Sequence, residues 1–567
     1  MPKMLIKHRP LLSRPESFQG VAPFIAEILA RRGVSSEQEL DLKLKFLLAP
    51  EMKGLEQAIQ RIDQAIDQQQ KIVIVGDYDA DGATSTALMV LVLRQMGAQV
   101  EYLVPDRFKY GYGLTPAIAD LAFCTYTPDL LITVDNGISS HTGVAQAQAH
   151  GMQVIITDHH LTTKPTPAAE AVVNPNQLGC PFPSKALAGV GVAFYVLANL
   201  ATHRKKLGKS TAAVVQYLDL VALGTYADVA SLDYNNRILI DAGLKRIQQG
   251  QCRPGITALL DIAGRDPASL KAQDLGFVLG PRINAAGRME TMDIGIECLL
   301  AQDLNQAYAL AQQLNQLNVE RRQVEGKIKQ EALAELETIQ LDTQDLPSAL
   351  IMYEPHWHQG VIGIVAGRLK EQFHRPSIVF ASDEDGLHIK GSARSIEGIH
   401  IRDCIEQIAE QYPHLISHFG GHAAAAGLSI LKEHFEEFKQ FFEALMATQD
   451  EQLFQAVLWT DGELPDYAFH LETVDLLQNL SPWGQKFPAP IFDGMFKVVD
   501  YRWLKDIHLK LRLALASGQV VDAIAFNAAD KYQFDPMQSE LRIVYELDKN
   551  TFNGVTNLQL RVLHLEQ

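Results

Sequence analysis

The sequence KIVIVGDYDADG at residues 71–82 joins an unbroken apolar run to three acidic residues at alternate positions. The run Ile72–Val75 consists only of β-branched residues, which predicts a strand buried on both faces of a parallel sheet. Asp77, Asp79 and Asp81 follow this run almost at once. Carboxylates this close repel one another and cannot all stay ionised without a positive charge between them. We interpret the stretch as a strand that brings acidic ligands to a divalent metal ion.

Two further apolar runs end in the same kind of side chain. Leu130–Val134 is followed by Asp135, and Val154–Thr157 is followed by the sequence Asp158–His160. Helix-like stretches separate these runs, and strands that alternate with helices indicate a parallel α/β sheet covered on both faces. Ligands of such sheets bind beyond the carboxyl ends of the strands. We therefore expect these acids and histidines to meet at one edge of the sheet, together with Asp228, which ends another apolar segment.

This set of side chains matches the needs of a two-metal phosphodiesterase, which uses bridging and terminal carboxylates and a neutral nitrogen ligand. The expected metal ligands are Asp77, Asp79, Asp81, Asp135, His159 and Asp228. A mixture of carboxylates and imidazole suits Mn²⁺ or Mg²⁺ better than structural zinc, so we expect two ions of one of these metals. A single aspartate at a strand end is more often a cap or turn residue, but five acids and two histidines together favour the metal site.

The sequence assigns individual roles within this set only in part. Asp81, Asp135 and His160 are the expected catalytic residues. His159 is favoured as a metal ligand and His160 as a proton donor or phosphate contact, although the sequence alone does not separate the two histidines. Asp158 either binds a metal or orients a neighbouring imidazole from behind it.

Composition sets the broad class of protein. The chain has 567 residues, too many for a single hydrophobic core, so we expect several domains. It contains no apolar run of about 18 residues, which argues against a membrane span. The five cysteines are scattered without a CxxC pair, and the first residues lack the apolar core of a signal peptide, so we expect a cytoplasmic protein. The net charge of −17 argues against a protein that coats nucleic acid but is compatible with a local basic groove.

The second half of the chain predicts three further elements. A strongly helical stretch at residues 301–340 predicts a long connecting helix. The strand-like segments Ser348–Tyr353 and Ser377–Phe380, with helical segments after each, predict a second mixed α/β unit. Towards the C-terminus apolar residues alternate with basic or small ones, as in Leu509–Leu515, and Asn553-Gly554 is a strong hairpin signal. These last features predict a small antiparallel barrel.

The same residues carry a resemblance to a known family. The acidic segment at 77–82, the sequence Val134–Gly137 and the run Asp158–His160 resemble the DHH phosphoesterase superfamily. Further motifs resemble, within that superfamily, the RecJ family of bacterial exonucleases: Arg107–Leu114, Ala222–Asp228, Pro281–Arg288, Trp357–Ala366 and Gly420–Gly427. The resemblance extends over residues 50–567 of the sequence.

The resemblance implies an α/β fold with four parts after a short lead-in. These parts are a parallel-sheet DHH catalytic domain, a long connecting helix, a second α/β DHH-associated domain and a C-terminal antiparallel β-barrel of the OB-fold type. The implied boundaries are 1–50 for the lead-in, 51–300 for the catalytic domain, 301–342 for the connecting helix, 343–450 for the DHH-associated domain and 451–567 for the barrel.

The resemblance also implies an activity. It implies a metal-dependent hydrolase that degrades single-stranded DNA from its 5′ end to 5′-mononucleotides, in DNA repair and recombination. It implies a monomer without membrane association that works with single-strand binding protein and a DNA helicase. By the same resemblance Arg107, Ser392 and Arg394 would hold the 5′-terminal phosphate. Beside it, the sequence Lys390–Ser395 combines cations and hydroxyl groups suited to a phosphate, although such a cluster alone is more often a surface loop.

Seven further residues are candidates for contacts along the DNA strand: Arg282, Arg288, His422, Trp357, His358, Lys510 and Arg512. Each has a structural alternative. For the two arginines of Pro281–Arg288 it is an ion pair with an acid on the connecting helix. For the Trp357–His358 pair it is partly buried packing, and for the glycine-rich sequence before His422 it is tight packing of a helix. Lys510 and Arg512, with Trp503, fit a basic face with an aromatic platform, but alternating basic residues are usually the solvent face of an edge strand.

Other functions fit parts of the sequence. A phosphodiesterase for short oligonucleotides or cyclic dinucleotides would use the same metal site, and a pyrophosphatase would leave the barrel without a purpose. A non-catalytic replication scaffold on this fold would be expected to have lost several metal acids, and here the set is complete. The long helix and the barrel favour a polymer substrate, so the exonuclease remains our prediction.

Overall fold

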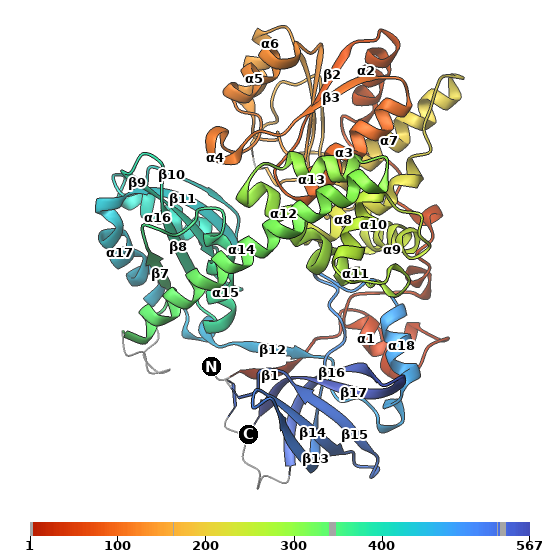
Figure 1. The fold of residues 1–567 in the computed structure, drawn as a ribbon, viewed down its shortest axis with the longest axis vertical. Helices are drawn as coiled ribbons and strands as arrows, with labels where there is room; N and C mark the ends of the chain where they lie inside the picture. The colour runs from red at the N-terminus through yellow and green to blue at the C-terminus, as the bar shows by residue number, and fades with distance from the viewer. Residues whose placement is uncertain (1–3, 163, 339–346, 530, 533–539, 567) are drawn as a thin grey trace. The chain divides into compact units, whose positions relative to one another are not determined.

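The computed structural model describes residues 4–162, 164–338, 347–529, 531–532 and 540–566. The chain forms two compact units, and Figure 1 colours both along the sequence. The first unit consists of residues 11–318 and 472–490, and the second consists of residues 1–10, 319–471 and 491–567. The long helix α14 (Leu304–Thr338) begins in the first unit and ends in the second.

A five-stranded parallel sheet lies at the centre of the DHH part of the first unit. Its strands are β2 (Lys71–Val75), β3 (Gln99–Leu103), β4 (Leu130–Val134), β5 (Gln153–Thr157) and β6 (Ala171–Val173). The order across the sheet is β3-β2-β4-β5-β6, and every neighbouring pair is parallel. The three strands that lead into the predicted ligands, β2, β4 and β5, are therefore adjacent, and their carboxyl ends lie at the same edge.

Helices cover both faces of this sheet (Figure 1). On one face α5 (Pro116–Tyr126) and α6 (His141–Ala149) pack against β2, β4 and β5 through a shared apolar cluster. On the other face lie α2 (Leu55–Asp67), α3 (Ala80–Gln95) and α7 (Gly189–Lys206). Because both sides of each strand are covered, the strands are apolar without alternation, as the sequence predicts.

The rest of the first unit is helical. Its helices are α1 (Pro23–Ala30), α4 (Arg107–Tyr110), α8 (Leu218–Ala227), α9 (Tyr234–Gln248), α10 (Pro254–Ile262), α11 (Ala272–Asp274), a π-helical turn (Leu275–Leu279), α12 (Gly280–Met289) and α13 (Asp293–Leu300). Helix α18 (Leu471–Asn479) comes much later in the sequence, yet the segment 472–490 that contains most of it belongs to this unit.

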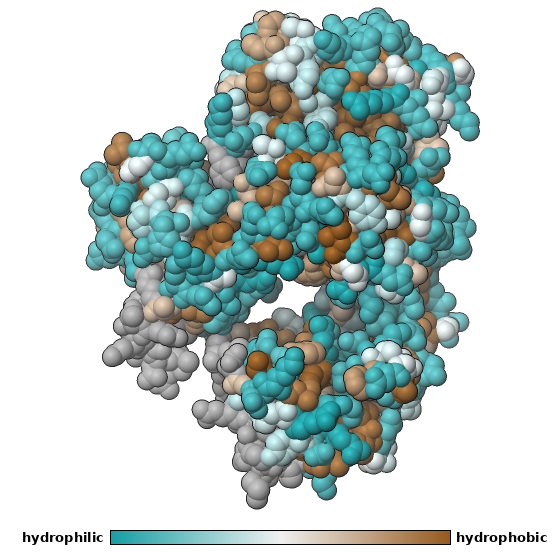
Figure 2. Space-filling model, viewed as in Figure 1, coloured by the Kyte–Doolittle hydropathy of each residue, from teal (hydrophilic) through white to brown (hydrophobic). Residues whose placement is uncertain are grey.

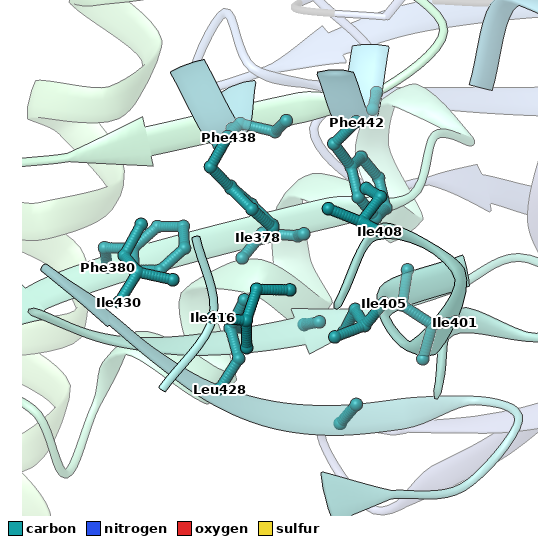
Figure 3. Close-up of a cluster of buried hydrophobic side chains, with 14 of the residues drawn as sticks. Ile378, Phe380, Ile401, Ile405, Ile408, Ile416, Leu428, Ile430, Phe438 and Phe442 are labelled. Atoms are coloured by element: carbon teal, nitrogen blue, oxygen red, sulfur yellow. The ribbon is translucent and has the colours of Figure 1, made fainter. Parts of the chain in front are cut away.

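A second, mixed α/β layer forms in the second unit. Its strands are β7 (Leu350–Tyr353), β8 (Ser377–Ser382), β9 (His388–Arg394), β10 (His418–Gly421) and β11 (Ala425–Leu431), in the order β10-β11-β9-β8-β7. Its helices are α15 (Ile362–Phe373), α16 (Ile401–Gln411) and α17 (Phe435–Ala447). Figure 3 shows the core, in which Phe438 and Phe442 of α17 lie with Ile405 of α16 and Phe380 of β8 in one buried cluster.

The C-terminal strands close into a barrel. They are β13 (Phe492–Leu504), β14 (His508–Ala514), β15 (Val520–Ala525), β16 (Glu540–Phe552) and β17 (Val555–Glu566), and β1 (Leu5–His8) pairs in parallel with β12 (Val457–Thr460) nearby in the same unit. The β16–β17 hairpin turns at Asn553 and Gly554, whose φ angles of 49° and 78° are those of the tight turn that the sequence predicts.

The predicted fold class is confirmed: a parallel DHH sheet, a long helix, a second α/β layer and a barrel of the OB-fold type. The barrel needs one correction, because β15 and β17 pair in parallel while the other described barrel pairs are antiparallel. Residues 339–346, where we place the boundary between the helix and the second α/β layer, lie outside the described residues.

The described helices include none that is long and apolar enough to cross a membrane. The face in view in Figure 2 is mainly hydrophilic, with apolar residues in smaller areas between.

Candidate metal centre

The acidic segment after β2 forms the start of α3. Asp79 is the N-cap of this helix, and its carboxylate accepts a hydrogen bond from the backbone N–H of Gly82 (3.0 Å). Asp81 lies in the first turn, where its carboxylate oxygens accept hydrogen bonds from the backbone N–H groups of Gly189 (2.6 Å) and Val190 (2.9 Å). These two residues begin α7, so the positive end of a second helix holds the Asp81 carboxylate in place.

Asp135, directly after β4, has an unusual backbone conformation. Its φ of 62° lies in the left-handed region, which is uncommon for a residue with a side chain and is typical of functional sites. A Cβ atom at Gly189 would lie 2.7 Å from Asp135 Oδ1, so this position needs glycine to leave room for the carboxylate. Asp135 is only 2% exposed, and its Oδ1 has no hydrogen-bond donor among the described residues.

His159 Nε2 lies among three carboxylates. It is 3.0 Å from Asp135 Oδ1, 3.9 Å from Asp81 Oδ2 and 4.0 Å from Asp228 Oδ2. The 3.0 Å contact lacks hydrogen-bond alignment, and within the described part of the chain this buried nitrogen has no other partner. Buried polar atoms are almost always satisfied, so an unpaired nitrogen facing an unpaired carboxylate oxygen fits a shared cation between them.

The ligand atoms fall into three overlapping sets. The oxygens of Asp77, Asp79 and Asp135 lie within 4.8 Å of one another, as do the ligand atoms of Asp81, His159 and Asp228 and those of Asp135, His159 and His160. Asp135 belongs to two of these sets, and so does His159. The residues therefore fit a pair of divalent ions.

The charges of this cluster call for such ions. Burial and then the neighbouring acids Asp81 and Asp79 raise the pKa of Asp135 well above its usual value. Asp228 has its pKa raised in the same way, and burial with Asp79 raises the pKa of Asp81 to about 7. Carboxylates pushed this far towards the neutral form are stabilised as anions when cations bind among them.

The structure distinguishes the two histidines. Burial, followed by the charge of its neighbour His160, lowers the pKa of His159 to about 4, so this imidazole is neutral and able to bind metal. Burial also opposes the charged form of His160, but its 2.7 Å hydrogen bond to Asp158 and the surrounding acids outweigh burial and raise its pKa to about 9. This contrast supports His159 as the ligand and His160 as a proton donor or phosphate contact.

Asp158 is buried and forms hydrogen bonds with both histidines. It is 1% exposed, and its Oδ2 accepts a hydrogen bond from the backbone N–H of Ile138 (2.8 Å). Its Oδ1 accepts from the backbone N–H groups of His159 (2.7 Å) and His160 (3.1 Å) and from His160 Nδ1 (2.7 Å). With both oxygens occupied, Asp158 orients the His160 imidazole, which supports the second of the two roles that the sequence left open.

Two residues around the centre were missed as individual contributors in the sequence analysis. Asn284 of α12 accepts a hydrogen bond from the backbone N–H of Ala80 at the start of α3 (2.7 Å). Tyr112 lies 3.1 Å from His160 Nε2 through its hydroxyl group. Both lie in motifs that the sequence analysis singled out, but their partners depend on how distant segments pack.

The predicted phosphate-binding residues Ser392 and Arg394 lie on β9 in the second unit. Arg394 donates hydrogen bonds to Ser392 Oγ (3.1 Å) and to the carbonyl oxygen of Ala393 (2.8 Å). Burial lowers its pKa, and among the described residues no acid pairs with it. A half-buried cation without a carboxylate is suited to an anion. Its third predicted partner, Arg107, has a side chain outside the described residues.

Gly363 of α15 lies in close contact with the side chains of Ser392 and Arg394. A Cβ atom at Gly363 would lie 2.7 Å from Ser392 Oγ and 3.0 Å from Arg394 Nη2. Gly363 is in the first turn of α15, so backbone N–H groups at a helix start lie next to the guanidinium and hydroxyl groups. This combination is typical of phosphate sites.

The candidates on α12 and after β7 differ in their surroundings. Arg282 donates to Asn315 Oδ1 of α14 (3.1 Å) and to the carbonyl oxygen of Val278 (2.6 Å). Arg288 lies half-buried in the last turn of α12. Trp357 is 4% exposed and its indole donates to Glu331, which favours the packing alternative for this residue. Its neighbour His358 is half-buried, and burial lowers the pKa of its imidazole, which favours the neutral form.

The barrel requires a further correction. Register pairs Lys510 with Arg502 and pairs Arg512 with Asp500, whereas Trp503 lies opposite the buried Leu509. Opposite residues of an antiparallel pair share a face and successive residues alternate, so Trp503 and the two basic residues do not form one platform.

Lys510 and His422 remain on the surface. Lys510 is half-exposed and forms an ion pair with Asp522 (2.7 Å), and Arg512 is exposed. His422 is exposed in the turn between β10 and β11, where the φ of 141° at Gly421 favours glycine. The side chains of Lys510, Arg512 and His422 are therefore accessible to a ligand.

Family models match all three folded parts of the chain. The DHH family N-terminal domain matches residues 71–225, the DHHA1 domain matches 346–448 and the RecJ OB domain matches 460–564. With overlapping metal ligand sets at the edge of a DHH sheet, the fold and the site define a metal-dependent phosphoesterase of the DHH class.

Similar proteins show which family within the DHH class the chain belongs to. The chain is 48% identical to "Single-stranded-DNA-specific exonuclease RecJ" of Dickeya dadantii over 95% of each chain, and 48% identical to that of Haemophilus influenzae over 96% of each. The chain belongs to the RecJ family. Among solved structures, RecJ of Thermus thermophilus in complex with Mn²⁺ has a TM-score of 0.83 at 29% identity, covering 99% of this chain and 79% of that one.

The metals of that relative agree with the ligand set. RecJ of Thermus thermophilus has also been solved in complex with Mg²⁺, with a TM-score of 0.77, 28% identity and coverage of 99% of this chain and 78% of that one. Mn²⁺ and Mg²⁺ are the two cations predicted from the mixture of carboxylates and imidazole, so the cofactor prediction is confirmed.

Proposed function

We propose that this protein is a single-stranded-DNA-specific exonuclease that hydrolyses phosphodiester bonds from the 5′ end, releases 5′-mononucleotides and acts in DNA repair and recombination. The observation that carries the proposal is the overlapping ligand sets around Asp135 and His159, in a chain 48% identical to RecJ exonucleases. The barrel and the DHHA1 domain support a polymer substrate over a dinucleotide.

The bound ions supply charge neutralisation and an activated water for attack on phosphorus. The protein residues do the rest. Asp81 and Asp135 hold their carboxylates in fixed directions through α7 and the strained turn after β4. His160, protonated and oriented by Asp158, is positioned to donate a proton or a hydrogen bond to a phosphate or leaving oxygen.

We propose that the strand's 5′ phosphate is recognised by Ser392 and Arg394, with Arg107 as a third contact. The half-buried guanidinium of Arg394, without an acid partner among the described residues, supports this assignment. Arg282, Arg288, His358, His422, Lys510 and Arg512 are proposed contacts for the rest of the strand. Trp357 is left out because its indole is buried.

Family membership supports three further proposals. The enzyme works as a monomer, in the cytoplasm, and together with single-strand binding protein and a DNA helicase that opens duplex DNA. Adding each partner to a cleavage assay on partly duplex DNA measures this cooperation, and we expect degradation of the duplex part only when the helicase is present.

One assay tests the central proposal. The protein is incubated with Mn²⁺ or Mg²⁺ and single strands labelled at either end, beside duplex and dinucleotide controls. We expect loss of the 5′ label first, as mononucleotides, and resistance of duplex DNA. Consumption from the 3′ end, or cleavage of dinucleotides alone, would show the proposal to be wrong.

A variant links this activity to the metal centre. Asp81→Ala should abolish cleavage and leave single-strand binding largely intact, because Asp81 is assigned to the metals and not to the DNA. Asp403→Ala, on the exposed side of α16, is the matched control and should cleave normally. Loss of folding in Asp81→Ala alone would make the acid structural.

A further inference from the structure

A short turn from the far end of the sequence belongs to the unit that holds the metal centre. This turn, Trp483–Phe487, is called the strap below. It lies in the segment 472–490, which follows the DHHA1 domain in sequence and directly precedes β13 of the barrel. The metal ligands all lie between Asp77 and Asp228 and belong to the same unit.

The strap is an ordered element. Gly484 and Phe487 exchange two backbone hydrogen bonds (2.9 and 3.1 Å), and the rings of Trp483 and Phe487 stack with centroids 5.2 Å apart. Two arginines of the first unit cover these rings. Arg32 lies 5.1 Å from the centroid of Trp483, and Arg237 lies 4.3 Å from that of Phe487. These contacts fasten the strap to the helical part of the unit.

The strap holds the chain on both sides of Asp228. On one side the hydroxyl group of Tyr226 donates a hydrogen bond to the carbonyl oxygen of Trp483 (2.7 Å). On the other side the backbone N–H of Leu232 donates to the carbonyl oxygen of Gln485 (2.9 Å). The loop that carries Asp228 is therefore tied to one turn at its start and at its end.

This loop needs such support. Asp228 caps the end of α8, and the next residue, Val229, has a φ of 58°. A β-branched residue in the left-handed region is a clear outlier and persists only when surrounding structure holds it. Val229 is 63% exposed, so its own side chain contributes little of that support. The ties at Tyr226 and Leu232 therefore add to the backbone hydrogen bonds from Asp228 to Gly224 (2.9 Å) and from Val229 to Tyr226 (3.2 Å) in holding the strained turn.

We propose that the strap is a positioning element for the metal ligand Asp228. By holding Tyr226 and Leu232 it fixes the Asp228 carboxylate within the set formed with Asp81 and His159, and so sets the affinity of that metal position. The inference rests on the metal centre of the proposed function. The two hydrogen bonds of the strap reach the residues on either side of Asp228, so the strap acts on the metal position through the backbone of this loop.

Two variants and one control test the proposal. Tyr226→Phe removes a single hydroxyl group. Gly484→Val adds a side chain where a Cβ atom already lies 2.7 Å from Leu232 Cδ1 and so pushes the loop aside. Gly326→Val makes the same change at an exposed helix position with nothing within 4 Å. Folding is checked by circular dichroism and thermal unfolding, and Mn²⁺ binding without DNA is measured by calorimetry.

We expect one of the two Mn²⁺ positions to lose about 10-fold in affinity in the strap variants, which is the range found for residues that orient metal ligands. Cleavage of single strands should then require more Mn²⁺ and recover its maximal rate when Mn²⁺ is raised. Gly326→Val should bind both ions as the unaltered protein does.

Strap variants that fold and bind both ions with unchanged affinity would overturn the proposal, even where their melting temperature falls, because packing alone explains such a result. Failure of the proposed function looks different. The unaltered protein would bind Mn²⁺ without cleaving single-stranded DNA, and the titration of the strap variants would still decide the role of the strap.

Discussion

Asp158 ties the side chain of His160 to the backbone of the turn that carries both histidines. Replacing it by asparagine keeps the volume but removes the negative charge that favours protonated His160. We therefore expect the pKa of His160 in Asp158→Asn to fall from about 9 towards its usual value of 6.5, so that the ring loses its proton at lower pH. Titration of the histidine resonances by NMR in metal-free protein measures the shift.

A second pair in the same unit serves as the reference. His150 Nε2 lies 2.6 Å from Asp120 Oδ1, away from the ligand sets, and Asp120→Asn should leave the titration of His160 unchanged. A His160 that titrates at the same pH with and without Asp158 would mean that the other acids of the centre hold its proton.

The sequence predicts well that the candidate ligands lie together and predicts their supports poorly. Asp77, Asp135 and His159 follow apolar strands within two residues, so the rule that ligands bind at the carboxyl ends of parallel strands places them together. Asn284 reaches the start of α3 from 204 residues away, and no local pattern predicts that contact. The sequence singles out Asn284 only as a member of the motif at residues 281–288.

At the scale of elements, β9 and the start of α15 together form the proposed phosphate site. Gly363→Val places a side chain against Ser392 Oγ and Arg394 Nη2, which a Cβ atom there would meet at 2.7 and 3.0 Å, and Arg394→Ala removes the cation. Charge-assisted hydrogen bonds contribute about 1.5–3 kcal/mol, so either variant should reduce the preference for 5′-phosphorylated over 5′-hydroxyl strands by about 10-fold or more. Cleavage rates on the two kinds of strand give this ratio.

Gly367→Val is the matched control on the same helix, because a Cβ atom there meets nothing within 4 Å. It should keep the preference. If Arg394→Ala also kept it, Arg394 would have no part in recognising the 5′ end.

At the scale of elements, the barrel shows that a sequence pattern predicts a strand but not its register with the next strand. The alternation in Leu509–Leu515 predicts strand β14 and its basic face correctly. The partners of that face depend on the register between β13 and β14, which shifts at an irregularity between Val498 and Asp500. One extra residue turns every later side chain to the other face, so Trp503 lies opposite Leu509 and away from Lys510.

For the whole molecule, the order of folded parts follows from the sequence, but the path of the chain between the two units does not. Residues 1–10 join the second unit through β1, and residues 472–490 join the first. Neither segment has a periodic pattern that predicts which part of the chain it packs against. The position of each is set by contacts with residues hundreds of positions away in the sequence. The strap is a consequence of this path.

The division into two units leads to a prediction about metal and stability. All ligands lie in the first unit, so Mn²⁺ should raise the unfolding temperature of that unit and leave the second unchanged. At a Mn²⁺ concentration about 100-fold above Kd the stabilisation is about 2.7 kcal/mol per ion. Calorimetric scans with Mn²⁺ and with EDTA measure this stabilisation.

Asp135→Asn suits the test, because asparagine tolerates the left-handed φ of this position. Without metal this variant should melt higher than the unaltered protein, since it removes one of several buried acids that repel each other, and its response to Mn²⁺ should be largely lost. Ser392→Ala, in the second unit, should respond normally. Equal shifts of both transitions, or a full Mn²⁺ response in Asp135→Asn, would place the ions elsewhere than at the shared carboxylate.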